Sequence, residues 1–287
     1  MHCRPTTSLL LLLLGLCGWL LAPACASAAE ADTPVKATLL SDTTAVSPGT
    51  PFTIGVQLAI RPGWHIYWLF PGDSGMKTSV RFQAPPGFTV GDLRFPTPEQ
   101  FADLDGSVFG YSGTVLLTAV VTPPSDPAQL AGDKAEFRAV ASWLCCQKVC
   151  LPGTSPCELA LPVGGEAKAA NQALFEATAK GIPVALGQPN CPASGNVHGE
   201  RAGETWTLTA DLQWLETPAK VEFFPTPEGA LKISDISVRN DGKHTLVSLK
   251  AQTLQGMTLS KPTLLAVIAG SDDHGARRGV QFHFDLK

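Results

Sequence analysis

The sequence predicts an all-β protein built from two antiparallel β-sandwich domains that a short helical linker joins. Three observations lead to this prediction. Short runs of β-forming residues alternate with turn residues along residues 35–163, a segment of helix-forming residues follows, and the strand pattern then returns. The 27 Gly and 24 Pro among 287 residues also suit short strands and many turns.

The first strand-rich part is divided by turn sequences such as Pro48-Gly49 and Pro85-Pro86-Gly87. Its clearest strand covers residues 52–60, where every second residue is apolar, as expected for a strand with one buried face. Two further strands are predicted at residues 114–121 and 136–144. This spacing without a long helical pattern is typical of an antiparallel sandwich.

Residues 166–177 predict a helix, because they include Ala, Leu, Glu and Lys and lack β-branched residues. Gly181-Ile182-Pro183 is expected to end it. Strands are then predicted at 205–212, 220–224, 231–238, 245–249, 262–268 and 279–284. The expected organisation is a signal peptide at 1–28, a first sandwich at 29–164, a helical linker at 165–190 and a smaller second sandwich at 191–287.

The first 28 residues have the features of a cleaved signal peptide. Arg4 precedes an apolar stretch at residues 9–22, and Ala26-Ser27-Ala28 fits a cleavage site. The apolar stretch is shorter than the ~20 residues of a spanning helix. Ala22 stands where a lipoprotein signal before Cys25 usually has Leu, so lipid anchoring is not expected. The sequence therefore predicts a soluble, exported protein without stable membrane insertion.

The composition excludes several classes of partner and fold. The formal net charge is −4, from 21 Lys+Arg and 25 Asp+Glu, and basic residues form no block. Nucleic acids and anionic membrane surfaces are therefore not expected as partners. With 44% hydrophobic and 16% charged residues, the chain is also unlike a disordered protein.

Five cysteines follow the predicted signal peptide, and thiols in an oxidising compartment tend to pair. Cys146 and Cys150 reach disulfide distance only if the chain turns at 147–149, because four residues of straight strand span roughly 13 Å. Neighbouring side chains of a strand point to opposite faces, so only one of Cys145 and Cys146 can share a face with Cys150. Cys146 is expected to be that residue, because it faces Cys150 across a short loop. The five are Cys145, Cys146, Cys150, Cys157 and Cys191.

Three interpretations of this cluster remain open. The first is an inert structural disulfide. The second is a redox-active pair, which the short loop between the cysteines favours, because a disulfide that closes a short loop stabilises a fold little. The third is a Cu(I) site formed by Cys145, Cys146 and Cys150. Asp272-Asp273-His274, in a loop flanked by Gly and Ser, is interpreted as a solvated turn rather than a metal site. No cofactor is expected.

Three separated motifs resemble the N-terminal periplasmic domain of the DsbD family, and within it the ScsB-like branch that is associated with copper sensitivity. In chain order they are GWHIYWLFPGDSG at 63–75, FGYSG at 109–113 and WLCCQKVCLP at 143–152. The resemblance covers about residues 35–165 and is specific because the motifs occur in the same order. The second half resembles, more weakly, the β-domain that follows in that branch.

The resemblance implies an immunoglobulin-like sandwich that relays electrons by thiol–disulfide exchange. The implied partners are a membrane-embedded electron donor and disulfide-bearing periplasmic proteins, oxidised or under copper stress, which dock transiently. Full-length family members continue into a membrane domain and a thioredoxin-like domain, and this sequence contains neither. The expected role is therefore one component of a protein-disulfide reductase. The alternative is a non-catalytic Cu(I)-binding or protein-interaction sandwich with a structural disulfide.

The resemblance also implies roles for individual residues. Cys146 and Cys150 match the redox pair, with Cys150 as the favoured attacking cysteine. Phe109 is the nearest counterpart of an aromatic cap that shields the pair. His65 and Tyr67 match positions near the pair, although His65 is equally interpreted as a packing residue. Cys145 and Cys157 are thiols additional to the motif.

Overall fold

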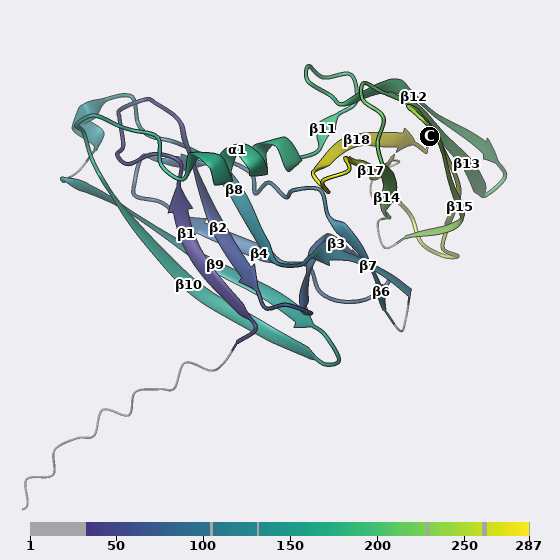
Figure 1. The fold of residues 1–287 in the computed structure, drawn as a ribbon, viewed down its shortest axis with the longest axis horizontal. Coiled ribbons are helices and arrows are strands. Elements are labelled where there is room, and N and C mark those ends of the chain that lie inside the picture. The colour runs from purple at the N-terminus through teal and green to yellow at the C-terminus, as the bar shows by residue number, and fades with distance from the viewer. Residues whose placement is uncertain (1–32, 104–105, 131, 228–229, 260–262, 287) are drawn as a thin grey trace, which may run out of the picture. The chain divides into compact units, whose positions relative to one another are not determined.

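The computed structural model describes residues 33–103, 106–130, 132–227, 230–259 and 263–286, which belong to one compact unit. The predicted signal peptide at 1–28 lies outside the described residues. Within them, strands dominate and a single α-helix occurs, so the all-β prediction is confirmed (Figure 1). The strands form four sheets, which pack as two β-sandwiches around two hydrophobic cores.

The first sandwich consists of a four-stranded and a six-stranded sheet. Strand order in the smaller sheet is β1 (Val35–Ser41), β2 (Phe52–Ile60), β8 (Thr114–Thr122) and β5 (Thr89–Val90). The larger sheet has the order β10 (Cys150–Pro162), β9 (Lys134–Cys146), β3 (His65–Gly72), β7 (Gly106–Tyr111) and β6 (Glu99–Asp103), and β4 (Ser79–Gln83) pairs with β9.

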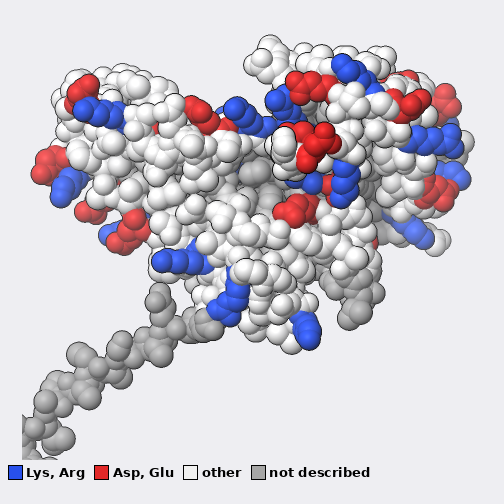
Figure 2. Space-filling model, in the orientation of Figure 1, with Lys and Arg blue, Asp and Glu red and all other residues white. Residues whose placement is uncertain are grey.

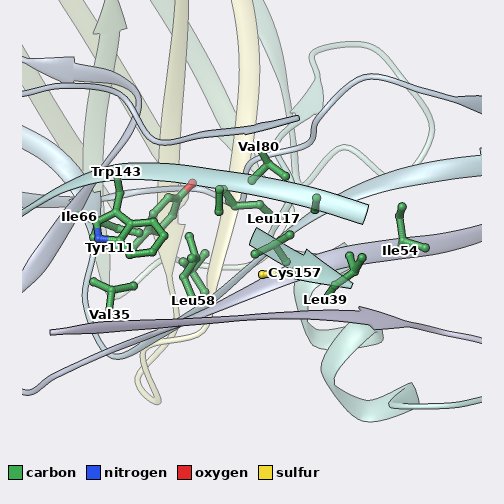
Figure 3. Packing of buried hydrophobic residues seen from close by; sticks show 14 of the residues in the cluster. Val35, Leu39, Ile54, Leu58, Ile66, Val80, Tyr111, Leu117, Trp143 and Cys157 are labelled. Atoms are coloured by element: carbon green, nitrogen blue, oxygen red, sulfur yellow. The ribbon is translucent and has the colours of Figure 1, made fainter. Parts of the chain in front are cut away.

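The core of this sandwich fills the space between the two sheets. Ile54, Leu58 and Leu117 of the smaller sheet are fully buried in it. Figure 3 shows Leu58 and Leu117 close to Ile66 and Trp143 of the larger sheet. The alternation of apolar residues along β2 predicted this buried face, because successive side chains of a strand point to opposite sides.

Strand pairing between β9 and β10 continues past Pro152. This proline lies within β10, paired with Leu144 of β9. Proline lacks the N–H that a central strand needs, but β10 is the terminal strand of its sheet and, among the described strands, pairs with β9 alone. Pro156 and Pro162 lie an even number of residues further along β10. All three prolines therefore have the same orientation relative to β9.

The predicted helix begins later than expected and ends where expected. Helix α1 spans Gln172–Gly181, and Ile182 follows as its C-terminal cap. Residues 166–170 are not helical, because their backbone hydrogen-bonds to the first sandwich: the Ala170 N–H donates to the Asp42 carbonyl, and the Lys168 carbonyl accepts from Thr44.

The second sandwich contains two four-stranded sheets. One has the order β11 (Val184–Ala185), β18 (Arg277–Asp285), β17 (Thr263–Ser271) and β14 (Lys220–Thr226), and the other has β12 (Ala193–Ala202), β13 (Thr205–Trp214), β16 (His244–Thr253) and β15 (Leu231–Asp241). The antiparallel prediction has one exception among these strands, since β11 pairs parallel to β18. β11 follows α1 after only two residues, so the direction in which the chain leaves the helix sets the direction of β11.

Phe224 of β14 joins the two sandwiches. It is fully buried and belongs to the core of the first sandwich, with ring centroids 5.1 Å from Phe109 and 6.2 Å from Trp68. Arg277 lies over the same ring and donates to Glu222 at 2.6 Å. Burial opposes the charge of Glu222, but hydrogen bonds from Lys220 and Arg277 lower its pKa overall. The junction therefore combines an aromatic contact with a largely buried ion pair.

Positive and negative side chains are interspersed on the face shown in Figure 2, with no large patch of one sign. In the part of the chain that the structure describes, α1 is too short to cross a membrane. Asp272 forms a turn, in which its carboxylate accepts the N–H groups of His274 and Ala276.

Candidate functional site

The candidate site lies at the tip of the β9–β10 hairpin. Cys146 ends β9, Cys150 begins β10, and the two residues pair directly and form a disulfide. Their Cα atoms are 4.1 Å apart, close to the spacing of about 4.5 Å in the narrower type of antiparallel pair. The Gln147 N–H donates to the Val149 carbonyl and closes the three-residue loop. The turn required by the cysteine spacing is thus present.

The two adjacent cysteines of β9 point to opposite faces of the sheet. Cys145 is completely buried in the core of the first sandwich, where Trp143 also lies. Cys146 belongs to a separate small cluster with Tyr67 and Val108. This arrangement follows from the alternation of side chains along the strand. Burial raises the pKa of the Cys145 thiol to about 11, more than nearby Arg61 lowers it, so this thiol stays protonated at neutral pH.

The two disulfide sulfurs have different environments. Cys146 is only 3% exposed, whereas Cys150 is an exposed residue. The Tyr67 hydroxyl donates a hydrogen bond to the Cys146 sulfur at 3.1 Å, inside the protein. Cys150 precedes Leu151, a large apolar residue that is itself exposed. Cys150 is therefore at the protein surface, whereas Cys146 is buried and its sulfur accepts a hydrogen bond.

Aromatic side chains surround the buried sulfur. His65 pairs with Cys146 across β3 and β9, and its ring packs edge-on against Tyr67 at 5.3 Å between centroids. On its other side, the ring of Phe101 stacks on His65 with centroids 4.8 Å apart. Phe101 comes from β6, and with Leu144 it packs against the Cys146 cluster. His65 and Tyr67 thus lie beside the disulfide.

Phe109 does not lie over the disulfide. It follows Val108 in β7, and the alternation of the strand directs it to the opposite side from the Cys146 cluster. There it packs on Phe224 and Phe70. This position does not fit a cap, so the expectation for Phe109 is corrected. Phe101, rather than Phe109, packs against the Cys146 cluster.

The remaining cysteines do not join the site. Cys157 pairs with Ala139 of β9, six positions along the hairpin from the Cys145–Leu151 pair, a distance of roughly 20 Å. Figure 3 shows Cys157 among the aliphatic side chains of the first core. Burial raises its pKa, which a hydrogen bond from Ser155 only partly offsets. Cys191 lies near β11, and its sulfur is 4.0 Å from the Val184 carbonyl.

The Cu(I) alternative does not fit this geometry. It requires the thiols of Cys145, Cys146 and Cys150 to converge, but Cys145 points into the core on the other face of the sheet. Within the described ranges, no group of three or more His, Cys, Asp or Glu side chains is arranged to hold a metal ion. The two thiols that do meet form a disulfide.

A Tyr67→Phe variant is expected to keep its fold, because the buried ring is retained, and to exchange its disulfide about tenfold more slowly. The lost hydroxyl donates to the Cys146 sulfur, so the sulfur leaves less readily as a thiolate. Stopped-flow measurement of reduction by dithiothreitol checks this. Tyr111→Phe is the matched control, since the Tyr111 hydroxyl donates to the Pro96 carbonyl instead. Equal rates for Tyr67→Phe and the unmodified protein would contradict the prediction.

Comparison with known proteins found a match to one protein family and a similar solved structure. Residues 36–162 match the family described as "Thiol:disulfide interchange protein DsbD, N-terminal". The fold is similar to the crystal structure of the N-terminal periplasmic domain of ScsB from Proteus mirabilis, with a TM-score of 0.58 and 18% sequence identity over 88% of this chain and 92% of that chain. No match was found among curated proteins.

Proposed function

We propose that the domain at residues 36–162, which matches the DsbD N-terminal family, exchanges electrons with other proteins through Cys146 and Cys150. The observation that carries the proposal is the asymmetry of the disulfide. Cys150 is exposed, whereas Cys146 is buried and accepts a hydrogen bond from Tyr67. A structural disulfide needs neither an exposed cysteine nor a buried hydrogen-bond donor.

The reduction of the domain proceeds in two exchanges. A thiolate of the electron donor attacks the Cys150 sulfur, and the bond to Cys146 breaks. Cys146 leaves as a thiolate, which the Tyr67 hydroxyl stabilises by its hydrogen bond. The second thiol of the donor then attacks the mixed disulfide, so the donor becomes oxidised and Cys150 is released.

The electron pair then passes to a client protein. The Cys150 thiolate attacks a disulfide of the client, and one client sulfur leaves as a thiolate. Cys146 next attacks the Cys150 sulfur of the mixed disulfide. The second client thiol is released, and the Cys146–Cys150 disulfide forms again. Cys150 is therefore the exchanging cysteine and Cys146 the resolving cysteine.

The proposed setting is the periplasm, with a membrane-embedded protein as the electron donor and oxidised periplasmic proteins as clients. The signal peptide predicted at 1–28 supports export, and the related ScsB domain is described as periplasmic. The resemblance to the ScsB-like branch extends the proposed clients to proteins under copper stress. Docking is expected to be transient, because the domain must release each partner before it meets the next.

The redox equilibrium of the isolated protein tests the proposal. Incubation in buffers of oxidised and reduced dithiothreitol, followed by thiol alkylation and mass spectrometry, gives the reduction potential of the Cys146–Cys150 pair. We expect a value above about −300 mV, in the range of disulfides that exchange in cells. A pair that stays oxidised below that potential would instead be a structural disulfide and would favour the interaction-module alternative.

A further inference from the structure

A groove of about 990 Å³ lies beside the candidate site, between the two sandwiches. On the first sandwich its lining includes Phe101 and Ser107. On the second sandwich it includes Phe223, Ile233 and Ile236. The groove thus begins at the residue that stacks on His65 and continues onto the second sandwich.

Two strands that line this groove each have one edge without a strand partner among the described residues. β6, whose residues 100–102 line it, is the terminal strand of the sheet that also carries the disulfide. β15, whose residues 231–233 line it, is the terminal strand of a sheet of the second sandwich. A terminal strand leaves a row of backbone N–H and C=O groups without a strand partner. Such an edge can accept an extended peptide as an additional strand.

The two edges differ in their capacity to accept a strand. β15 contains a bulge between Ser234 and Ser237, and an ion pair of 2.8 Å between Asp235 and Lys250 holds its extra residues. Because a bulge interrupts the regular ladder, β15 is the poorer template. β6 pairs with β7 without a register shift over its five residues. β6 is therefore the better edge for an added strand.

The wall opposite β6 supplies exposed apolar side chains. Ile236 is 50% exposed and Val238 is 37% exposed, and both line the groove. Large apolar side chains that remain exposed beside a groove are typical of an interaction site. A segment paired with β6 would present alternate side chains toward this wall, because side chains alternate along a strand.

The groove is also within reach of the disulfide. A strand added to β6 would lie five strand spacings from β10, which carries Cys150, and this corresponds to roughly 24 Å at the usual strand spacing. A client chain covers this distance with about seven extended residues. One client can thus occupy the groove and present a cysteine to Cys150.

We propose that this groove binds an extended segment of the client polypeptide, which adds as a strand to β6 and packs its apolar side chains against Ile236 and Val238. The inference rests on the proposed exchange function, because it assigns the partner of that site. It gives the second sandwich a role: it forms one wall of the client-binding groove. Clients with an unfolded, β-prone segment near a disulfide are then preferred over folded ones.

The test uses a short synthetic peptide of alternating valine and threonine, followed after about seven residues by a cysteine in mixed disulfide with glutathione. A second peptide carries N-methyl groups at alternate valine–threonine positions, which remove the N–H groups needed for strand pairing. The second-order rate constant for reduction of each peptide by the reduced protein is measured. Oxidised glutathione serves as the substrate that does not need the groove.

We expect the unmethylated peptide to react about tenfold faster than the N-methylated one. An Ile236→Asp variant should lose this difference and reduce oxidised glutathione at the normal rate. Leu215→Asp is the matched control, because Leu215 is a 65% exposed apolar residue of the second sandwich that does not line the groove. This control should keep the preference for the unmethylated peptide.

Different results separate the inference from the proposed function. Equal rates for the two peptides, with normal reduction of glutathione, would show that no client strand pairs with β6 in the groove. The proposed exchange function would then still stand. Failure to reduce both peptides and glutathione would overturn the exchange function itself. If Ile236→Asp also slows glutathione reduction, Val238→Asp replaces it, and retention of the peptide preference in that variant would overturn the inference.

Discussion

A Cys146→Ser variant is expected to accumulate mixed disulfides with its partners, and a Cys150→Ser variant is expected to form none. Cys150 is exposed and remains able to attack in the first variant, while the resolving thiol is absent. In the second variant the remaining Cys146 is 3% exposed and packed against Tyr67 and Val108. Both variants should lose reduction of a client disulfide by about a thousandfold or more.

The measurement is non-reducing electrophoresis of each variant after acid quenching in its native compartment, followed by mass spectrometry of the trapped species. Cys191→Ser is the control, because Cys191 lies in the second sandwich near Val184, and it should exchange normally. Trapping by Cys150→Ser alone would make Cys146 the exchanging residue. Absence of trapping in both variants, with both folded, would leave a structural disulfide.

The sequence predicted most strongly those strands whose side chains alternate between core and solvent. The strand predicted at 52–60 is β2 without a change of bounds, because its apolar residues face the first core at every second position. β12 was not predicted, since nearly all its residues are polar or exposed and it is a terminal strand. β10 contains three prolines, which only a terminal strand accommodates, and its place in the sheet is set by the whole fold.

The disulfide could be predicted from the sequence, and its aromatic surroundings could not. The spacing of Cys146 and Cys150 requires a turn, and alternation along β9 sends Cys145 to the other face. Phe101, in contrast, reaches His65 because β6 and β3 both pair with β7 in particular registers. Register across three strands depends on tertiary packing, so no local pattern marked Phe101 as a site residue.

Gly110 explains part of the FGYSG motif in physical terms. It pairs with Tyr67 between β7 and β3, and a Cβ atom at this position would collide with the Ile66 carbonyl. Only glycine lets the two strands approach this closely. The motif therefore positions β3, and with it the tyrosine that contacts the Cys146 sulfur.

A Phe224→Ala variant is expected to lose about 3–5 kcal/mol of unfolding free energy. The side chain is fully buried, and its loss leaves a cavity between Trp68, Phe109 and the second sandwich. The cost rises further because Arg277, which lies over the ring, loses that contact while its charge remains largely buried. Denaturant unfolding followed by tryptophan fluorescence measures the change, since Trp68 contacts the substituted residue.

Leu215→Ala serves as the control, because an exposed apolar side chain contributes within about 0.5 kcal/mol. A loss below about 1 kcal/mol for Phe224→Ala would show that the junction relaxes around the missing ring, and the prediction would be wrong. The expected loss has a consequence for the site as well. Trp68 follows Tyr67 in β3 and points to the opposite face, so the ring contact that holds Trp68 also steadies the strand that carries the Tyr67 hydroxyl to Cys146.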